Sequence, residues 1–71
     1  MSNTMIVVLN FIESNMLSDQ WFNAEDIPAV ISNNNSLNIL RGLATREKLS
    51  SEQDPKSLLG YERFKRIGVI A

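Results

Sequence analysis

Apolar residues recur at helical spacing near the start of the chain. They follow one another every three or four residues, which at 100° per residue places them on one stripe of a helix. The pattern therefore predicts an amphipathic helix over about residues 4–17. Its apolar positions are Met5, Val8, Leu9, Ile12 and Met16.

A second apolar pair, Val7 and Phe11, lies one helical turn apart on the flank of this stripe. Two interpretations are open for the pair. It extends the hydrophobic core, which we favour, or it forms a contact between two copies of the chain.

A second, short helix is predicted over about residues 24–32. Asn23 precedes it as N-cap, and Glu25 and Asp26 bring negative charge to the positive end of the helix dipole. Pro28 falls near the end of the first turn, where its missing N–H costs little or introduces a bend. The apolar face of this helix consists of Ile27, Val30 and Ile31.

An asparagine-rich run then predicts a tight turn over residues 32–35, since asparagine tolerates the left-handed conformation. Ser36 follows as the N-cap of a third helix over about residues 37–49. The apolar side of this helix carries Leu37, Leu40, Leu43 and Ala44. Its opposite side carries Asn38, Arg41, Gly42, Thr45 and Lys48.

The segment 58–70 fits two structures. As a strand, it would pair with residues 49–53 in a hairpin whose polar tip is residues 54–57. As a helix, it would begin after Asp54 and end at Gly68, but its apolar residues would then spread around most of the helix circumference. We favour the strand.

Composition excludes several classes of function. The chain has 71 residues, enough for one small core, and it contains no cysteine and no histidine. Disulfides, the common zinc sites and Ser-His-Asp catalysis are therefore impossible. Its three glycines cannot form a phosphate-binding glycine loop. We expect no enzymatic activity, no cofactor and no metal.

The longest apolar run, Met5–Leu9, is far shorter than the ~20 residues that a membrane-spanning helix needs. The start of the chain also lacks the basic and apolar segments of a signal peptide. These features predict a cytoplasmic protein without a membrane partner.

Charge is divided unevenly along the chain. Residues 1–40 carry four acidic residues and no basic one, whereas residues 41–71 carry seven basic and four acidic residues, a net +3. Such asymmetry indicates either a polyanionic partner on one side of the molecule or a merely dipolar surface. Because the whole chain has a net charge of −1, nucleic-acid binding would require a local basic face.

The order of predicted elements resembles the winged helix-turn-helix superfamily of DNA-binding domains over about residues 4–67. The resemblance rests on NAEDIPAVIS as the supporting helix, SLNILRGLATREKL as the recognition helix and SSEQDPKSLLGYERFKRI as the wing. Trp21 and Phe22 take the place of the short strand that often precedes the supporting helix. The resemblance implies one domain over residues 1–71, mainly α with a small β-hairpin (α+β). The brevity of the chain is similar to that of small regulators carried by phages or plasmids.

The major groove admits one α-helix, so a helix that reads DNA needs apolar residues inward and polar donors outward. Asparagine pairs with adenine and arginine with guanine, which makes Asn38 and Arg41 the candidate base readers. Gly42 would let the helix approach the groove floor. The candidate DNA-binding residues at this helix are Asn34, Asn35, Ser36, Asn38, Arg41, Thr45 and Lys48. Those of the wing are Lys56, Arg63, Lys65 and Arg66.

Each of these residues also has a plainer interpretation. Asn38 and Arg41 could be ordinary solvated residues, and cations on an edge strand discourage aggregation. Tyr61 and Phe64 could stack on single-stranded nucleic acid, although we favour a place in the core for both and for Trp21.

The function expected from these features is that of a small sequence-specific DNA-binding protein, a transcriptional regulator that acts on double-stranded DNA. The expectation depends on the cations of the second half converging on one surface. The alternative is a protein–protein interaction module, an adaptor or inhibitor, that uses the same fold without binding DNA. In either case the chain could form a homodimer.

Overall fold

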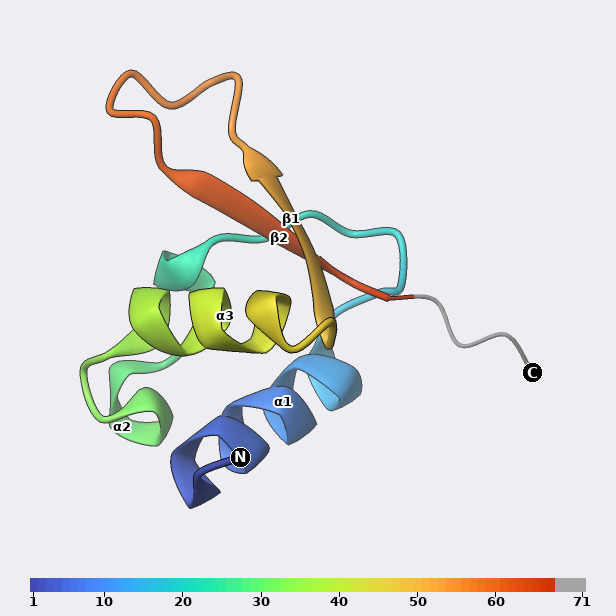
Figure 1. Cartoon of the computed structure of the whole chain (residues 1–71), viewed down its shortest axis with the longest axis vertical. Helices are drawn as coiled ribbons and strands as arrows, with labels where there is room; N and C mark the ends of the chain where they lie inside the picture. Colours follow the sequence, from blue (N-terminus) through green and yellow to red (C-terminus); the bar gives the residue numbers. More distant parts are fainter. Residues whose placement is uncertain (68–71) are drawn as a thin grey trace.

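The computed structural model describes residues 1–67, which form three α-helices, one 3-10 turn and one antiparallel hairpin (Figure 1). The predicted α+β fold class is therefore confirmed. The first helix, α1, spans Asn3–Asn15, close to the predicted range. Ser2 caps it, because its hydroxyl accepts a hydrogen bond from the N–H of Met5 at 3.2 Å.

The predicted second helix is broken into two pieces. Ala24–Asp26 form the 3-10 turn η1, which Asn23 and Asp26 close with a capping box, and α2 spans only Ala29–Ser32. Between them Ile27 is extended (φ −98°, ψ 121°), because a residue before proline is pushed out of the helical region. Pro28 thus breaks the helix and caps α2.

The break also changes the apolar face of this segment. Ile27 is buried and Ile31 is half-buried against the core, but Val30 is 87% exposed. The prediction of Val30 as a core-facing residue is therefore wrong, because α2 completes only about one turn.

The third helix, α3, spans Ser36–Thr45 and ends before the predicted residue 49. Its N-cap is Asn35, so Ser36 is the first helical residue and not the cap. At the other end Glu47 adopts the left-handed conformation (φ 62°). The N–H groups of Glu47 and Lys48 donate to the carbonyls of Ala44 and Leu43 at 3.0 and 2.9 Å, the pattern of a Schellman motif.

The hairpin consists of β1 (Leu49–Gln53) and β2 (Glu62–Arg66), paired antiparallel with Leu49 opposite Arg66. The strand interpretation of this segment is therefore right, although β2 begins at Glu62 and the tip covers residues 54–61. Gly68, the predicted end of the helical alternative, lies outside the described residues. Phe22 pairs with Phe64 through an isolated bridge on the other edge of β2, as expected for a short strand before the second helix.

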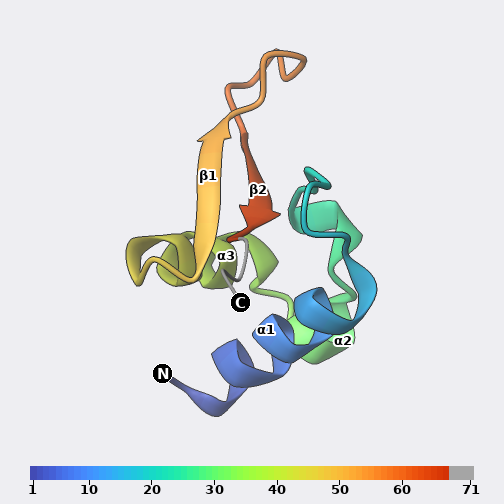
Figure 2. The ribbon, with the colours of Figure 1, turned by 90° about the vertical axis from the view of Figure 1, so that its right-hand side faces the viewer.

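The helix α3 lies in the middle of the molecule. The hairpin stands on one side of it, and α1 and α2 pack on the other (Figures 1 and 2). Because α3 contacts neighbours on both sides, its buried face is wider than predicted and includes Ile39. The core consists of Val8, Ile12, Met16, Phe22, Ile27, Ile39, Leu40, Leu43, Leu49 and Phe64.

Candidate nucleic-acid interface

The exposed side of α3 carries the polar stripe that the sequence predicts. Asn38, Arg41 and Thr45 are exposed and follow one another at intervals of three and four residues, so they lie on one helix face. Leu40 and Leu43 point the other way and are completely buried. The stripe is therefore held outward by the packing of the opposite face.

Asn34 and Asn35 extend this stripe at the start of α3. Both are exposed, and Asn34 adopts the left-handed conformation (φ 59°) that was predicted for the turn. The amide of Asn38 donates to the side-chain oxygen of Asn35 at 2.9 Å, which fixes the two side chains next to each other. Ser36 is turned inward, because its hydroxyl lies 2.6 Å from the hydroxyl of the buried Ser32.

Arg41 is bound to the hairpin through Glu62. Its Nε donates to the two carboxylate oxygens at 3.0 and 3.3 Å, and its Nη2 lies 2.9 Å from Oε1. The side chains are 47% and 32% exposed, so the pair contributes only roughly 0–1 kcal/mol to stability. Thr45 is engaged within the helix, where its hydroxyl donates to the Arg41 carbonyl at 2.9 Å.

A shallow hollow of about 440 Å³ separates α3 from the hairpin at this point. Side chains of both elements line it, and it is open to solvent. The lining residues are Arg41, Ala44, Thr45, Ser51 and Glu62. The base-reading candidate Arg41 therefore borders a shallow, mainly polar hollow.

Arg63 and Lys65 lie on the outer face of the hairpin, away from α3. Side chains alternate along a strand, and Phe64 between them points into the core. Both cations lie over the ring of Trp21, with Cζ of Arg63 at 4.5 Å and Nζ of Lys65 at 4.6 Å from the ring centroid. Arg63 also forms an ion pair with Glu52, directly opposite on β1.

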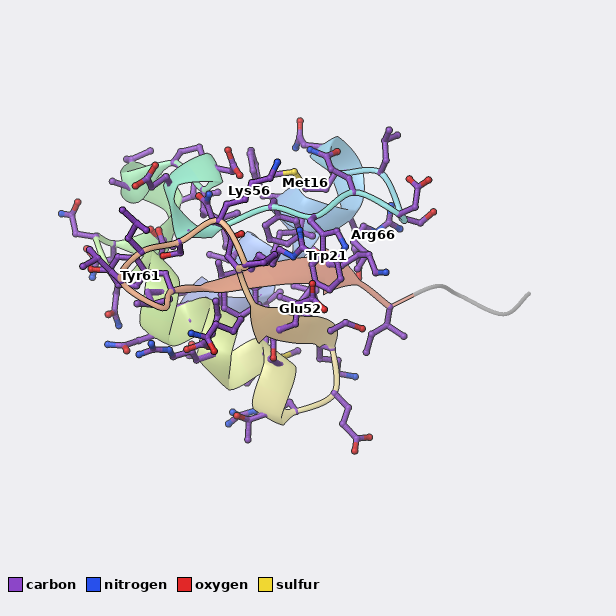
Figure 3. The ribbon with its side chains drawn as sticks, turned by 90° about the horizontal axis from the view of Figure 1, so that it is seen from above. Met16, Trp21, Glu52, Lys56, Tyr61 and Arg66 are labelled. Atoms are coloured by element: carbon purple, nitrogen blue, oxygen red, sulfur yellow. The ribbon has the colours of Figure 1, made fainter. Side chains whose placement is uncertain are left out.

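The other predicted wing cations lie apart from this group. Arg66 is half-buried at the far end of β2, where its Nη1 donates to the carbonyl of Met16 at 3.0 Å (Figure 3). Lys56 is exposed on the hairpin tip. Lys48 is exposed as well, but it follows α3 and is not part of it.

The expectation of one converging basic surface is therefore wrong. Arg41 pairs with Glu62, which lies on the same face of β2 as Phe64, whereas Arg63 and Lys65 lie on the opposite face. Glu62 and Arg63 are neighbours in sequence, and neighbouring side chains of a strand point to opposite faces. Arg41, bound to Glu62, is therefore separated from Arg63 and Lys65. The polar stripe of α3 and the cations of the outer face are two distinct surfaces.

Three further predictions need correction. Gly42 faces α1, where an added Cβ would lie 2.9 Å from Cε of Met5, so it makes room for a helix and not for a groove floor. Trp21 is half-buried on the outer face and is not a core anchor. Tyr61 is exposed on the hairpin tip, while Phe64 is in the core as favoured.

Sequence reasoning missed the two acidic partners, Glu62 and Glu52. Glu52 could have been found, because it is directly opposite Arg63 once the hairpin register is known. Glu62 could not, because its partner Arg41 is 21 residues away on another element.

Within residues 1–67 no helix is long and apolar enough to cross a membrane. The same residues contain no group of acidic side chains that could hold a metal ion. Comparison of the chain with protein-family models, curated proteins and solved structures found no match.

Proposed function

We propose that this protein is a small sequence-specific DNA-binding protein, a transcriptional regulator that inserts α3 into the major groove. The observation that carries the proposal is the exposed stripe Asn38, Arg41 and Thr45 on a helix whose other face is anchored in the core. Amide and guanidinium groups at this spacing match the hydrogen-bonding edges of neighbouring bases. Asn34 and Asn35 lie at the start of the helix, where neutral donors suit phosphate contacts.

The arrangement of elements supports a winged helix-turn-helix mode of binding. The Phe22 bridge beside β2 matches the short strand of such domains, and the hairpin follows α3 directly. In this mode the hairpin tip, with Lys56 exposed, contacts the DNA backbone next to the groove that α3 occupies. A regulator of this kind would act in the cytoplasm, like the small regulators carried by phages or plasmids that the chain resembles in its brevity.

The proposal does not rest on the converging basic surface that the sequence led us to expect, because Arg41 is separated from Arg63 and Lys65; it rests on the α3 stripe. Electrostatics therefore limit the affinity that one copy of the chain reaches. The net charge is −1, and Arg41 and Arg63 are both offset by carboxylates. With few phosphate contacts, one domain binds a single site weakly unless it dimerises or binds cooperatively.

The proposal is tested by fluorescence anisotropy with labelled duplex DNA at several salt concentrations. We expect affinity that falls steeply with salt, and loss of affinity in Asn38→Ala and Arg41→Ala. Asn10→Ala removes another exposed asparagine, on α1, and is the matched control, which should bind like the wild type. Absence of duplex binding at low salt would reject the proposal.

A protein–protein interaction module is the second candidate, and the hairpin tip favours it. Leu58 is 102% exposed and Leu59 77% exposed, next to the exposed Tyr61. Adjacent exposed leucines are typical of a surface that another protein covers. If this function is right, Leu58→Ser and Leu59→Ser abolish capture of a specific partner, whereas Asn38→Ala and Arg41→Ala have no effect on it.

A further inference from the structure

The guanidinium group of Arg41 is bound to Glu62 along only one of its edges. Arginine has five N–H donors in a planar fork. The side edge of Arg41, formed by Nε and Nη2, is taken by the Glu62 carboxylate at distances between 2.9 and 3.3 Å. Within residues 1–67 no acceptor is bonded to Nη1. The end edge, formed by Nη1 and the second N–H of Nη2, therefore remains for a ligand.

Both partners of this pair are anchored in regular structure. Arg41 lies inside α3, and Glu62 is the first residue of β2, opposite Gln53. The arginine side chain is 47% exposed and the glutamate side chain 32%, so the glutamate is the more buried partner of the pair. A side chain held in this way loses less conformational entropy when a ligand binds than an unrestrained arginine does.

The available edge has the geometry that guanine requires. In the major groove guanine presents two adjacent acceptors, N7 and O6, which two parallel N–H donors of one arginine bind together. We propose that Glu62 is a positioning residue that directs the end edge of Arg41 toward guanine and so determines sequence specificity. This inference rests on the DNA-binding function proposed above. It adds that Arg41 contacts guanine and that Glu62 positions Arg41 for this contact.

Glu62 would affect DNA binding in one way through its charge and in another way by positioning Arg41. A carboxylate beside Arg41 lowers the attraction of this site for phosphates, whatever the DNA sequence. It does not remove the two donors of the end edge. If Glu62 acted only through its charge, replacing it would tighten binding to every duplex equally. If it positions Arg41, replacing it lowers the preference for guanine.

The experiment begins by selecting the preferred duplex of the wild-type protein from a random library. Each guanine of that duplex is then replaced in turn by 7-deazaguanine, which lacks the N7 acceptor but still pairs with cytosine. Anisotropy titration gives the affinity for each duplex. The guanine contacted by Arg41 is the one whose replacement weakens the wild type about tenfold and leaves Arg41→Ala unaffected.

At that guanine we expect Glu62→Ala, which removes both carboxylate acceptors, to lose most of the tenfold preference while its affinity for an unrelated duplex is unchanged or higher. Glu62→Asp keeps the charge but shortens the side chain, and we expect the same loss. Glu52→Ala removes an equal charge from the outer-face pair with Arg63, so it should keep the preference. Circular dichroism of each variant checks that the fold is intact.

Two results would overturn the inference, and they differ from each other. If Glu62→Ala keeps the full preference while Arg41→Ala loses it, DNA binding stands and the positioning role is wrong. If the wild type binds no duplex at low salt, the proposed function fails and the inference fails with it.

Discussion

Phe22 and Phe64 join the two halves of the chain by exchanging both of their backbone hydrogen bonds. The N–H of Phe22 donates to the Phe64 carbonyl at 2.8 Å, and the N–H of Phe64 donates to the Phe22 carbonyl at 2.7 Å. Their rings are buried with centroids 6.4 Å apart in a tilted arrangement. The strand β2 is therefore paired on both edges, by β1 and by the segment that follows α1.

This relationship predicts that Phe64 is central to stability. Phe64→Ala removes a completely buried ring, and we expect the free energy of unfolding to fall by about 3–5 kcal/mol. Urea denaturation followed by circular dichroism measures the loss. Tyr61→Ala removes an exposed aromatic side chain from the same hairpin and should change stability by less than about 0.5 kcal/mol. Equal unfolding midpoints for the two variants would contradict the prediction.

The end of α3 provides a stabilising substitution. Glu47 occupies the left-handed position of the Schellman motif (φ 62°), where glycine is favoured because it has no Cβ. We expect Glu47→Gly to raise the free energy of unfolding by about 0.5–1 kcal/mol. Glu13→Gly, at an exposed position in the last turn of α1 where the backbone is helical, should lower it. Thermal denaturation of both variants checks the opposite signs.

The apolar flank of α1 divides into a core residue and a surface residue. Phe11 is half-buried and packs against the core, whereas Val7 is 47% exposed. We expect Phe11→Ser to lower the free energy of unfolding by about 1–3 kcal/mol and Val7→Ser to leave it within about 0.5 kcal/mol of the wild type.

Val7 thus becomes the better probe of self-association. Light scattering of folded Val7→Ser gives its mass in solution. A lower mass than that of the wild type would assign this side of α1 to a contact between two copies. A loss of stability in Val7→Ser comparable to that of Phe11→Ser would contradict the division.

Local signals in the sequence predicted the order of elements well. The apolar spacing of α1, the asparagine turn and the alternation around Phe64 each depend on neighbours within a few residues, so they could be recognised without the fold. Two predicted boundaries are wrong for equally local reasons. Pro28 forces Ile27 out of the helical region, and Glu47 adopts a conformation more often taken by glycine.

The candidate site was less predictable, because it depends on which elements meet. The stripe on α3 follows from helical spacing alone. The partners of its cations do not: Arg41 reaches Glu62 on another element, and the segment after α1 brings Trp21 against Arg63 and Lys65. No periodicity in the sequence encodes such contacts, because they depend on how the hairpin packs against α3 and against the segment after α1.

The two basic groups, Arg41 on one face and Arg63 with Lys65 on the other, predict that substitutions in them weaken DNA binding to different extents. Because Arg41 lies on the α3 side and Arg63 and Lys65 on the outer face, Arg41→Ala should weaken duplex binding more than the double variant Arg63→Ala, Lys65→Ala. At 0.1 M salt the screening length is about 10 Å, so cations that do not contact the duplex contribute little. Anisotropy titrations at two salt concentrations compare the variants.

Trp21 adds an independent measurement on the wild type. It is the single tryptophan of the chain and lies beneath both outer-face cations, so its fluorescence reports on that face alone. A duplex bound along α3 leaves its emission unchanged. A duplex bound to the outer face displaces Arg63 or Lys65 from the ring and alters the emission. If the emission changes on binding and the double variant binds more weakly than Arg41→Ala, the interface is the outer face of the hairpin and not the α3 stripe.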